Sequence, residues 1–252
     1  MRKDTRTGDP EKSPAATEVL STWHGVPLEV ICNHGAASRI QVLPDGILRV
    51  TIPDARAVEP LLEAHATWIH RKIAQIHQVI REHPENNNRL LLDGEYYAVR
   101  EGPACTVNRE ARVITYTTPF GLKRALATLL RAELSGRISV RCGAAAKKCR
   151  KICVRMQKTR WASCSARGTL SFNLALSALP PDLRDYIVAH ELAHFEVPNH
   201  SSKFWDLLES RYHGARAADR RLRMFWILIG RNRYWQVLRD LGTWESAFRR
   251  RE

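Results

Sequence analysis

Two histidines and a glutamate stand together in the segment His190-Glu191-Leu192-Ala193-His194. Side chains four positions apart on a helix lie on the same face, one turn apart, so both imidazoles can bind a single metal ion. Histidine nitrogens are common zinc ligands, and the intervening Glu191 would lie beside the metal, where it can take a proton from a water molecule. The spacing therefore predicts a catalytic zinc site in which Glu191 is the general base.

The residues around this motif favour a buried helix. Leu179-Pro180-Pro181-Asp182 is a strong helix start, because proline suits the first helical turn. Pro198 ends the helix after the motif. The segment is apolar on much of its surface, and buried polar side chains need partners, which a metal ion would supply. The apolar positions are Leu183, Tyr186, Ile187, Ala189, Leu192 and Ala193.

A third ligand would leave one position of a tetrahedral zinc ion open for water or substrate. His200 follows His194 by six positions, the spacing of the HExxHxxGxxH motif, although Val197 stands where that motif has glycine. Asn199 tolerates a left-handed backbone and could replace the glycine in the turn. We prefer His200, and the alternatives are Glu209 and His213 on the next expected helix.

Three stretches of the chain resemble the YgjP-like metallopeptidases, which are related to the SprT-like and minimal zincin proteins. The first is Gln157 to Ser165, which is similar to the family's KTRWGSCS segment with Ala162 in place of the usual glycine. The second is Leu170 to Leu176, which is similar to the family's strand before the catalytic helix. The third runs from His190 through His200 to Trp205. The similarity covers roughly residues 26–240 and is sharp over residues 155–206.

The resemblance implies a zincin-like catalytic domain with His190, His194 and His200 as zinc ligands and Glu191 as general base. Substrate would be a protein or peptide, and the strand at Leu170 to Leu174 is our candidate for pairing with its extended backbone. A group besides zinc must stabilise the oxyanion, and Arg160, Tyr212 and His213 are the candidates.

Hydrophobic periodicity predicts an α+β fold with a β-rich N-terminal part and a helical C-terminal part. The expected strands are residues 28–31, 39–42, 47–52, 90–92, 96–99, 112–117, 150–156 and 169–174. The expected helices are residues 57–82, 122–134, the motif helix, 201–212 and 216–240.

The predicted domain organisation has four parts: a flexible tail (1–20), a β-rich subdomain with one long helix (21–120), the metallopeptidase domain (121–245) and a basic tail (246–252). The N-terminus lacks the apolar stretch of a secretory signal, and no apolar run is long enough to span a membrane, so we expect a cytoplasmic protein.

The irregularly spaced cysteines are expected to be reduced, although Cys149 and Cys153 could form a second metal site or a disulfide. Cys164 is expected to orient the Trp161 loop rather than to act as a nucleophile.

The formal net charge is +14, and many of the arginines lie in the C-terminal half. Such arginines usually form a solvated helix face, and the alternative interpretation is that they attract nucleic acid or another polyanion.

Three function classes remain open: a zinc metallopeptidase, which the motif favours; a zinc nucleotide phosphohydrolase; and a nucleic-acid-associated protease or binding protein. No phosphate-binding glycine loop supports the second class, and an intact Glu191 disfavours a purely structural zinc site.

Overall fold

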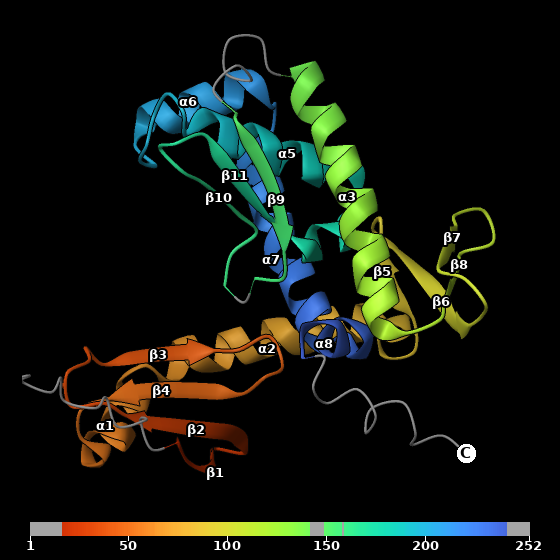
Figure 1. Cartoon of the computed structure of the whole chain (residues 1–252). Coiled ribbons are helices and arrows are strands. Elements are labelled where there is room, and N and C mark those ends of the chain that lie inside the picture. Colours follow the sequence, from red (N-terminus) through yellow and green to blue (C-terminus); the bar gives the residue numbers. More distant parts are fainter. Residues whose placement is uncertain (1–16, 142–148, 158, 241–252) are drawn as a thin grey trace, which may run out of the picture. The chain divides into compact units, whose positions relative to one another are not determined.

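A computed structural model describes residues 17–141, 149–157 and 159–240 (Figure 1). These residues form seven α-helices and three small mixed sheets, which confirms the predicted α+β class. The chain divides into two compact units, Met1–His77 and Gln78–Glu252, and the division falls within one helix. The expected tail 1–20 is described only from Thr17, where the first strand begins, and residues 241–252 lie outside the described part.

The N-terminal unit is built on a four-stranded sheet in the order β1-β2-β4-β3. The strands expected at 39–42 and 47–52 correspond to β3 and β4, which pair antiparallel, and β2 pairs parallel to β4. Strand β1 was not predicted from the sequence. His24 and Gly25, both with positive φ, form the turn that connects β1 to β2. The strands are β1 (Thr17–Trp23), β2 (Val26–Cys32), β3 (Arg39–Val42) and β4 (Leu48–Ile52).

One side of this sheet is closed by apolar residues of the next helices. The single helix expected over 57–82 is wrong, because the chain breaks at His65 into α1 (Val58–Ala64) and α2 (Ala66–Glu82), after a short 3-10 turn at Ala55–Ala57. The His65 ring nitrogen lies 2.9 Å from the Leu61 carbonyl oxygen, which competes with the regular helical bond there. The core of this unit contains Leu48, Val50, Leu62 and Ile69, all fully buried.

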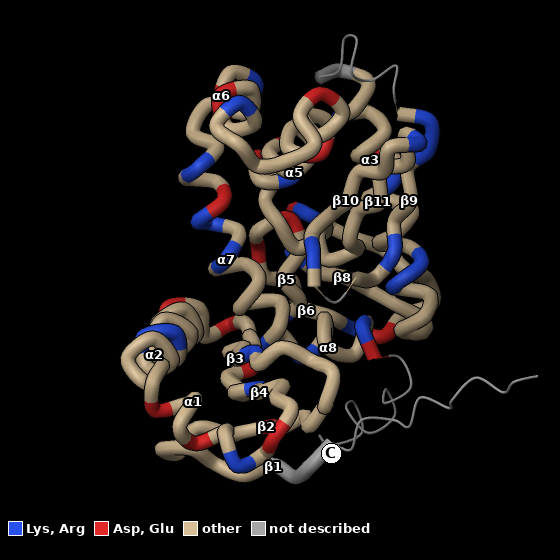
Figure 2. The backbone as a smooth tube through the Cα atoms, turned by 90° about the vertical axis from the view of Figure 1, so that its left-hand side faces the viewer, with Lys and Arg blue, Asp and Glu red and all other residues tan. Residues whose placement is uncertain are grey.

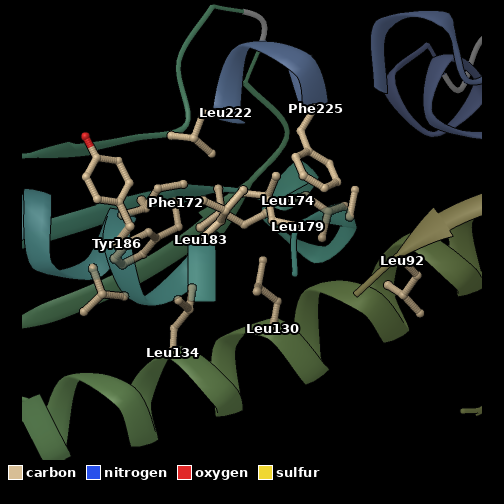
Figure 3. Close-up of a cluster of buried hydrophobic side chains, with 14 of the residues drawn as sticks. Leu92, Leu130, Leu134, Phe172, Leu174, Leu179, Leu183, Tyr186, Leu222 and Phe225 are labelled. Atoms are coloured by element: carbon tan, nitrogen blue, oxygen red, sulfur yellow. The ribbon is translucent and has the colours of Figure 1, made fainter. Parts of the chain in front are cut away.

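In the C-terminal unit, the end of α2 is followed by a 3-10 turn, Pro84–Asn87, and by a sheet in the order β5-β6-β8-β7. Its strands are β5 (Leu90–Leu92), β6 (Glu95–Glu101), β7 (Thr106–Asn108) and β8 (Val113–Tyr116), of which β7 was missed by the sequence. The long helix α3 (Pro119–Arg141) follows and starts and ends outside the expected 122–134. Leu130 and Leu134 of this helix meet Phe172, Leu183 and Phe225 in the core (Figure 3).

A second sheet, in the order β10-β11-β9, packs beside this core. Strand β9 (Lys151–Arg155) pairs parallel to β11 (Thr169–Asn173), and β10 (Ala162–Cys164) pairs antiparallel to β11. A 3-10 turn, Leu174–Ala178, leads from β11 into the motif helix. Strand β11 is thus the central strand, and β10, which the sequence did not predict, lies at the edge.

The C-terminal helices complete the second unit. They are α5 (Pro181–Ala193), α6 (Ser202–Arg211), α7 (Ala215–Arg231) and α8 (Arg233–Arg239). The expected helix 216–240 is wrong in one respect, because it breaks at Asn232. That fully buried amide accepts a bond from the Trp235 amide and donates to the carbonyls of Asn86 and Arg89, so it caps α8 and fixes it to the start of the unit.

Helix α5 is fixed near its start by buried charges. Arg184, 4% exposed, lies 2.7 Å from Asp93 and 3.0 Å from Glu133 of α3. Asp93 and Gly94, both with positive φ, form the β5–β6 turn and donate backbone bonds to the carbonyls of Ser177 and Ala178. Ion pairs and turn together hold the helix that carries the histidines. Within the described residues, no helix is long and apolar enough to cross a membrane.

Candidate metal centre

Helix α5 presents His190 and His194 on one face at its C-terminal end, as the spacing predicts. Pro180 is the N-cap residue and Pro181 the first helical residue, and His194 closes the helix. The expected apolar positions of α5 are buried, so the helix is held in the core, while His190 and His194 remain partly exposed. The two imidazole rings lie with centroids 5.0 Å apart.

His200 is brought to the same point by the turn after α5. Its Nε2 lies 3.1 Å from Nε2 of His190, and one ligand atom from each of His190, His194 and His200 lies within 4.8 Å of the others. The His194 Nδ1 lies 3.2 Å from the Val197 carbonyl oxygen, which leaves Nε2 of His194 as the acceptor nitrogen. The three rings can hold a metal ion between them.

The turn between His194 and His200 does not use Asn199 in a left-handed conformation, contrary to the expectation from the sequence. Asn199 is absent from the described residues that have positive φ, so it does not replace a glycine in a left-handed turn. Its side-chain oxygen accepts a bond from the Ser201 amide at 3.3 Å, immediately before α6. The residue that positions the triad is Phe204, fully buried on α6, whose ring centroid lies 4.7 to 4.9 Å from those of the three histidines.

The histidines on α5 are held in the neutral state that metal binding requires. Burial lowers the pKa of His190 to about 3, with further lowering from His194 and His200. Burial also lowers the pKa of His194, and His200 adds to the effect while the Val197 carbonyl opposes it. The Nδ1 of His190 is buried and has no hydrogen-bond partner among the described residues.

Of the described residues that line the site, Glu191 is the only one with a carboxylate. It is 6% exposed, and burial raises its pKa to about 7, while Arg160 acts in the opposite direction. Its Oε2 is buried, and in the described part of the chain nothing donates a hydrogen bond to it. A buried carboxylate with an unpartnered Oε2 among the described residues and a pKa near neutrality is suited to accept and return a proton.

The triad and Glu191 line a cleft of about 1050 Å³ whose opposite wall is strand β10 and the turn that follows it. Ala162, Ser163 and Cys164 of β10 all face this cleft, as do Arg150, Arg160 and Arg167. The arginines at 150 and 167, and the strand itself, were not among the expected site residues. The turn Ser165-Ala166-Arg167-Gly168, in which Gly168 has positive φ, is the sequence signal that could have predicted the hairpin.

The sheet order corrects the expected substrate strand. Strand β11 cannot pair with a substrate backbone, because β9 and β10 occupy both of its edges. The residues that flank β10 bond to β11: the Trp161 carbonyl accepts from the Asn173 amide, and the Ser165 amide donates to the Thr169 carbonyl. Because bonding alternates along an antiparallel strand, the backbone groups of Ala162 and Cys164 point to the outer edge. That edge lines the cleft, and no strand in the described residues pairs with it.

Asn173, fully buried at the end of β11, positions the loop that leads into β10. Its amide donates to the carbonyls of Gln157 and Arg160, and its oxygen accepts from the amides of Gln157 and Ala175. Arg160 is the one oxyanion candidate that lines the cleft. The other two do not, since Tyr212 packs on Tyr186 and the side chain of His213 is fully exposed.

The alternative third ligands and the cysteines have other positions. Glu209 accepts bonds from the amides of Gly214 and Ala215 at the start of α7, and His213 lies 3.7 Å from Glu209. The five described cysteines, Cys149 and Cys153 among them, are free, and Cys142 lies outside the described residues. Burial raises the pKa of Cys164 to about 11, with Glu191 contributing, so its thiol stays protonated at neutral pH.

Comparisons with known proteins place the chain in a family. No curated protein matches it. A solved structure, the metallopeptidase zymogen of Pyrococcus abyssi abylysin, matches with 25% identity over 35% of this chain and 90% of its own, and its TM-score of 0.32 is too low to carry an argument. The model of the YgjP-like metallopeptidase domain matches residues 37–225, which include the histidines, Glu191 and the β10 wall. The chain belongs to the YgjP-like metallopeptidase domain family.

Proposed function

We propose that this protein is a zinc-dependent peptidase in which His190, His194 and His200 hold the metal ion and Glu191 is the general base. The observation that carries the proposal is the convergence of three histidine nitrogens within 4.8 Å beside a buried carboxylate that has no partner for its Oε2 among the described residues. The family adds that the domain is a metallopeptidase.

The donor atoms fit zinc. Two nitrogen ligands about 2.0–2.1 Å from a tetrahedral ion lie about 3.3 Å apart, and Nε2 of His190 and Nε2 of His200 are 3.1 Å apart. Such a short separation between two neutral imidazoles is readily explained if both nitrogens point at one cation. Three imidazoles with a cleft on the open side are the donor set of a catalytic rather than a structural zinc site.

Zinc, when bound, would act as a Lewis acid that makes a water molecule in the cleft more acidic and polarises a carbonyl group. Glu191 would take the proton from that water and deliver it to the leaving amine, for which a pKa of about 7 is well matched. Arg160, on the cleft wall and close enough to act on the Glu191 carboxylate, is our candidate for stabilising the oxyanion.

The outer edge of β10 favours a peptide over a nucleotide as substrate. An extended peptide can pair with the outward backbone groups of Ala162 and Cys164 and so be held across the cleft from Glu191. A nucleotide offers no such alternation of donors and acceptors. A zinc phosphohydrolase remains the second candidate, and the arginines of the cleft are the observation in its favour.

The test is hydrolysis of a mixed peptide library by the zinc-loaded protein and by its Glu191→Gln variant, with zinc measured in both. We expect cleavage only by the parent protein and equal zinc in the two proteins, because the amide keeps the shape of the side chain but cannot accept the proton. Cleavage of nucleotides but of no peptide would replace the proposal with the phosphohydrolase. Undiminished cleavage by Glu191→Gln would remove Glu191 from the base role.

A further inference from the structure

Three arginines line the cleft of the candidate metal centre. Arg160 precedes β10, Arg167 lies in the turn after it, and Arg150 immediately precedes β9. Figure 2 shows Lys and Arg positions in blue along the sheet formed by β10, β11 and β9. Glu191, which is buried, is the single acidic residue among the described residues that line this cleft. The cleft therefore presents a strong excess of positive charge to whatever enters it.

These arginines differ from several others in the C-terminal unit, which are paired with carboxylates. Arg211 pairs with Glu196, Arg221 with Asp182 and Arg223 with Asp219. Among the described residues, Arg150, Arg160 and Arg167 have no acidic partner within ion-pair distance, and all are exposed. Three unpaired cations around one cleft repel one another, so the free site is suited to accept a negative charge.

The three arginines fall into two positions along β10. Arg160 lies at the start of the strand and acts on Glu191, so it belongs to the reacting centre. Arg150 and Arg167 lie together at the other end, because the Arg150 amide donates to the Gly168 carbonyl at 2.8 Å. Bonds within the turn, from the Gly168 amide to Ser165 O and from the Thr169 amide to Ser165 Oγ, fix the backbone that carries Arg167.

We propose that Arg150 and Arg167 form a subsite that selects an acidic side chain, Asp or Glu, of a peptide held along β10. The proposal rests on the proposed peptidase function and names its substrate class. A peptide in β conformation advances about 3.3 Å per residue, so a carboxylate one or two residues from the cleaved bond can reach the end of the three-residue strand. Guanidinium groups bind carboxylates through paired hydrogen bonds, which gives the selection its geometry.

The test compares two peptides that differ only in Asp against Asn at one position, scanned over the four residues on each side of the cleaved bond. For the zinc-loaded parent protein, we expect kcat/KM for the Asp peptide to be roughly three- to tenfold higher at one position. The preference should shrink as salt is added. It should disappear in Arg150→Gln/Arg167→Gln and change to a preference for Lys in Arg150→Glu/Arg167→Glu.

A matched control removes the same charge elsewhere. Arg124 and Arg131 are exposed on α3, and neither lines the cleft. Arg124→Gln/Arg131→Gln should therefore keep the full Asp preference. An equal loss of preference in this control would overturn the subsite, because net charge alone would then explain the selectivity.

The outcomes separate the subsite from the peptidase. Efficient cleavage with no preference at any position would overturn the subsite and leave the peptidase intact. If the parent protein cleaves no peptide, fluorescence anisotropy with labelled Asp and Asn peptides still tests the subsite: tighter binding of the Asp peptide that is lost in Arg150→Gln/Arg167→Gln supports it, and equal Kd values overturn it. A single-stranded oligonucleotide of equal charge that binds more tightly through the same arginines would also overturn it, in favour of nucleic acid.

Discussion

At the scale of single residues, the site depends on which groups are charged and which are neutral. Burial keeps the imidazoles of His190 and His194 neutral, while the same burial raises the pKa of Glu191 to about 7. One turn of α5 thus supplies nitrogen donors and a proton acceptor, with roles that follow from their environment rather than from residue type alone.

Glu191→Gln should lower kcat for peptide cleavage by about 10²- to 10⁴-fold, the usual contribution of a general base. Zinc content should be unchanged, because the glutamate is not one of the three converging groups. Steady-state kinetics and metal analysis of the same preparations would check this, and a loss of zinc together with activity would instead assign Glu191 a role in binding the metal.

Cys164→Ala should retain hydrolysis, because the Cys164 thiol, with its pKa raised to about 11, is protonated at neutral pH and is a poor nucleophile. The backbone of β10, which we expect to pair with substrate, is unaltered by this change. Kinetics beside Glu191→Gln would decide the matter, since an equally severe loss in Cys164→Ala would point to thiol chemistry.

At the scale of elements, α5 is held by the β5–β6 turn and by buried charge. Gly94 has φ of 82°, and a Cβ added there would lie 2.9 Å from Cβ of Pro180, the residue that caps α5. Gly94→Ala should therefore lower the free energy of unfolding by about 1–3 kcal/mol.

Gly136→Ala is the matched control for this prediction. Gly136 lies within α3, and nothing lies within 4 Å of an added Cβ, so alanine should leave stability unchanged or raise it by about 0.5–1 kcal/mol. Urea unfolding of the two variants would check the difference, and equal effects would contradict the close contact at Pro180.

Arg184→Met should also destabilise the protein, by about 3 kcal/mol, because it leaves Asp93 and Glu133 without their buried cation. This loss of unfolding free energy lies at the lower end of the range for a broken buried ion pair, because Arg109 still pairs with Asp93 and Arg137 with Glu133. Arg221→Met removes an exposed pair with Asp182 and should cost less than about 1 kcal/mol. Similar losses in urea unfolding would show that burial of Arg184 is unimportant.

Many of the helices and strands could be predicted from the sequence, wherever neighbouring residues alone determine the local structure. The start of α5 at Pro180-Pro181, the hairpin of β3 and β4 and the ligand spacing on the helix all follow from neighbouring residues. Strand β10 could not be predicted, since three residues carry little periodicity and its register is set by β11. The breaks at His65 and Asn232 likewise depend on side-chain bonds that interrupt an otherwise helical pattern.

At the scale of the whole molecule, the family match over residues 37–225 crosses the division between the two compact units, whereas every candidate site residue lies in the second. The cleft residues come from segments far apart in the sequence, which is why Arg150 and Arg167 were not expected beside the histidines. Attraction of the basic protein to nucleic acid stays a prediction.

Removal of the metal should reduce the stability of the folded chain. A ligand present at 100 to 1,000 times its Kd adds about 2.7–4.1 kcal/mol, so an excess of chelator should lower the Tm of the zinc-loaded protein. His190→Ala should show no such response to chelator, because its site is already incomplete. Calorimetry of both proteins would check this, and equal shifts in Tm would mean that the chelator acts elsewhere.

The most direct measurement is the zinc content of protein purified without added metal or chelator, for the parent chain and for His190→Ala, His194→Ala, His200→Ala and His213→Ala. We expect about one zinc per chain, lost in the first three variants and kept in His213→Ala, because the His213 side chain is fully exposed and outside the triad. Zinc retained when the triad is broken, or lost with His213, would contradict the metal centre described above.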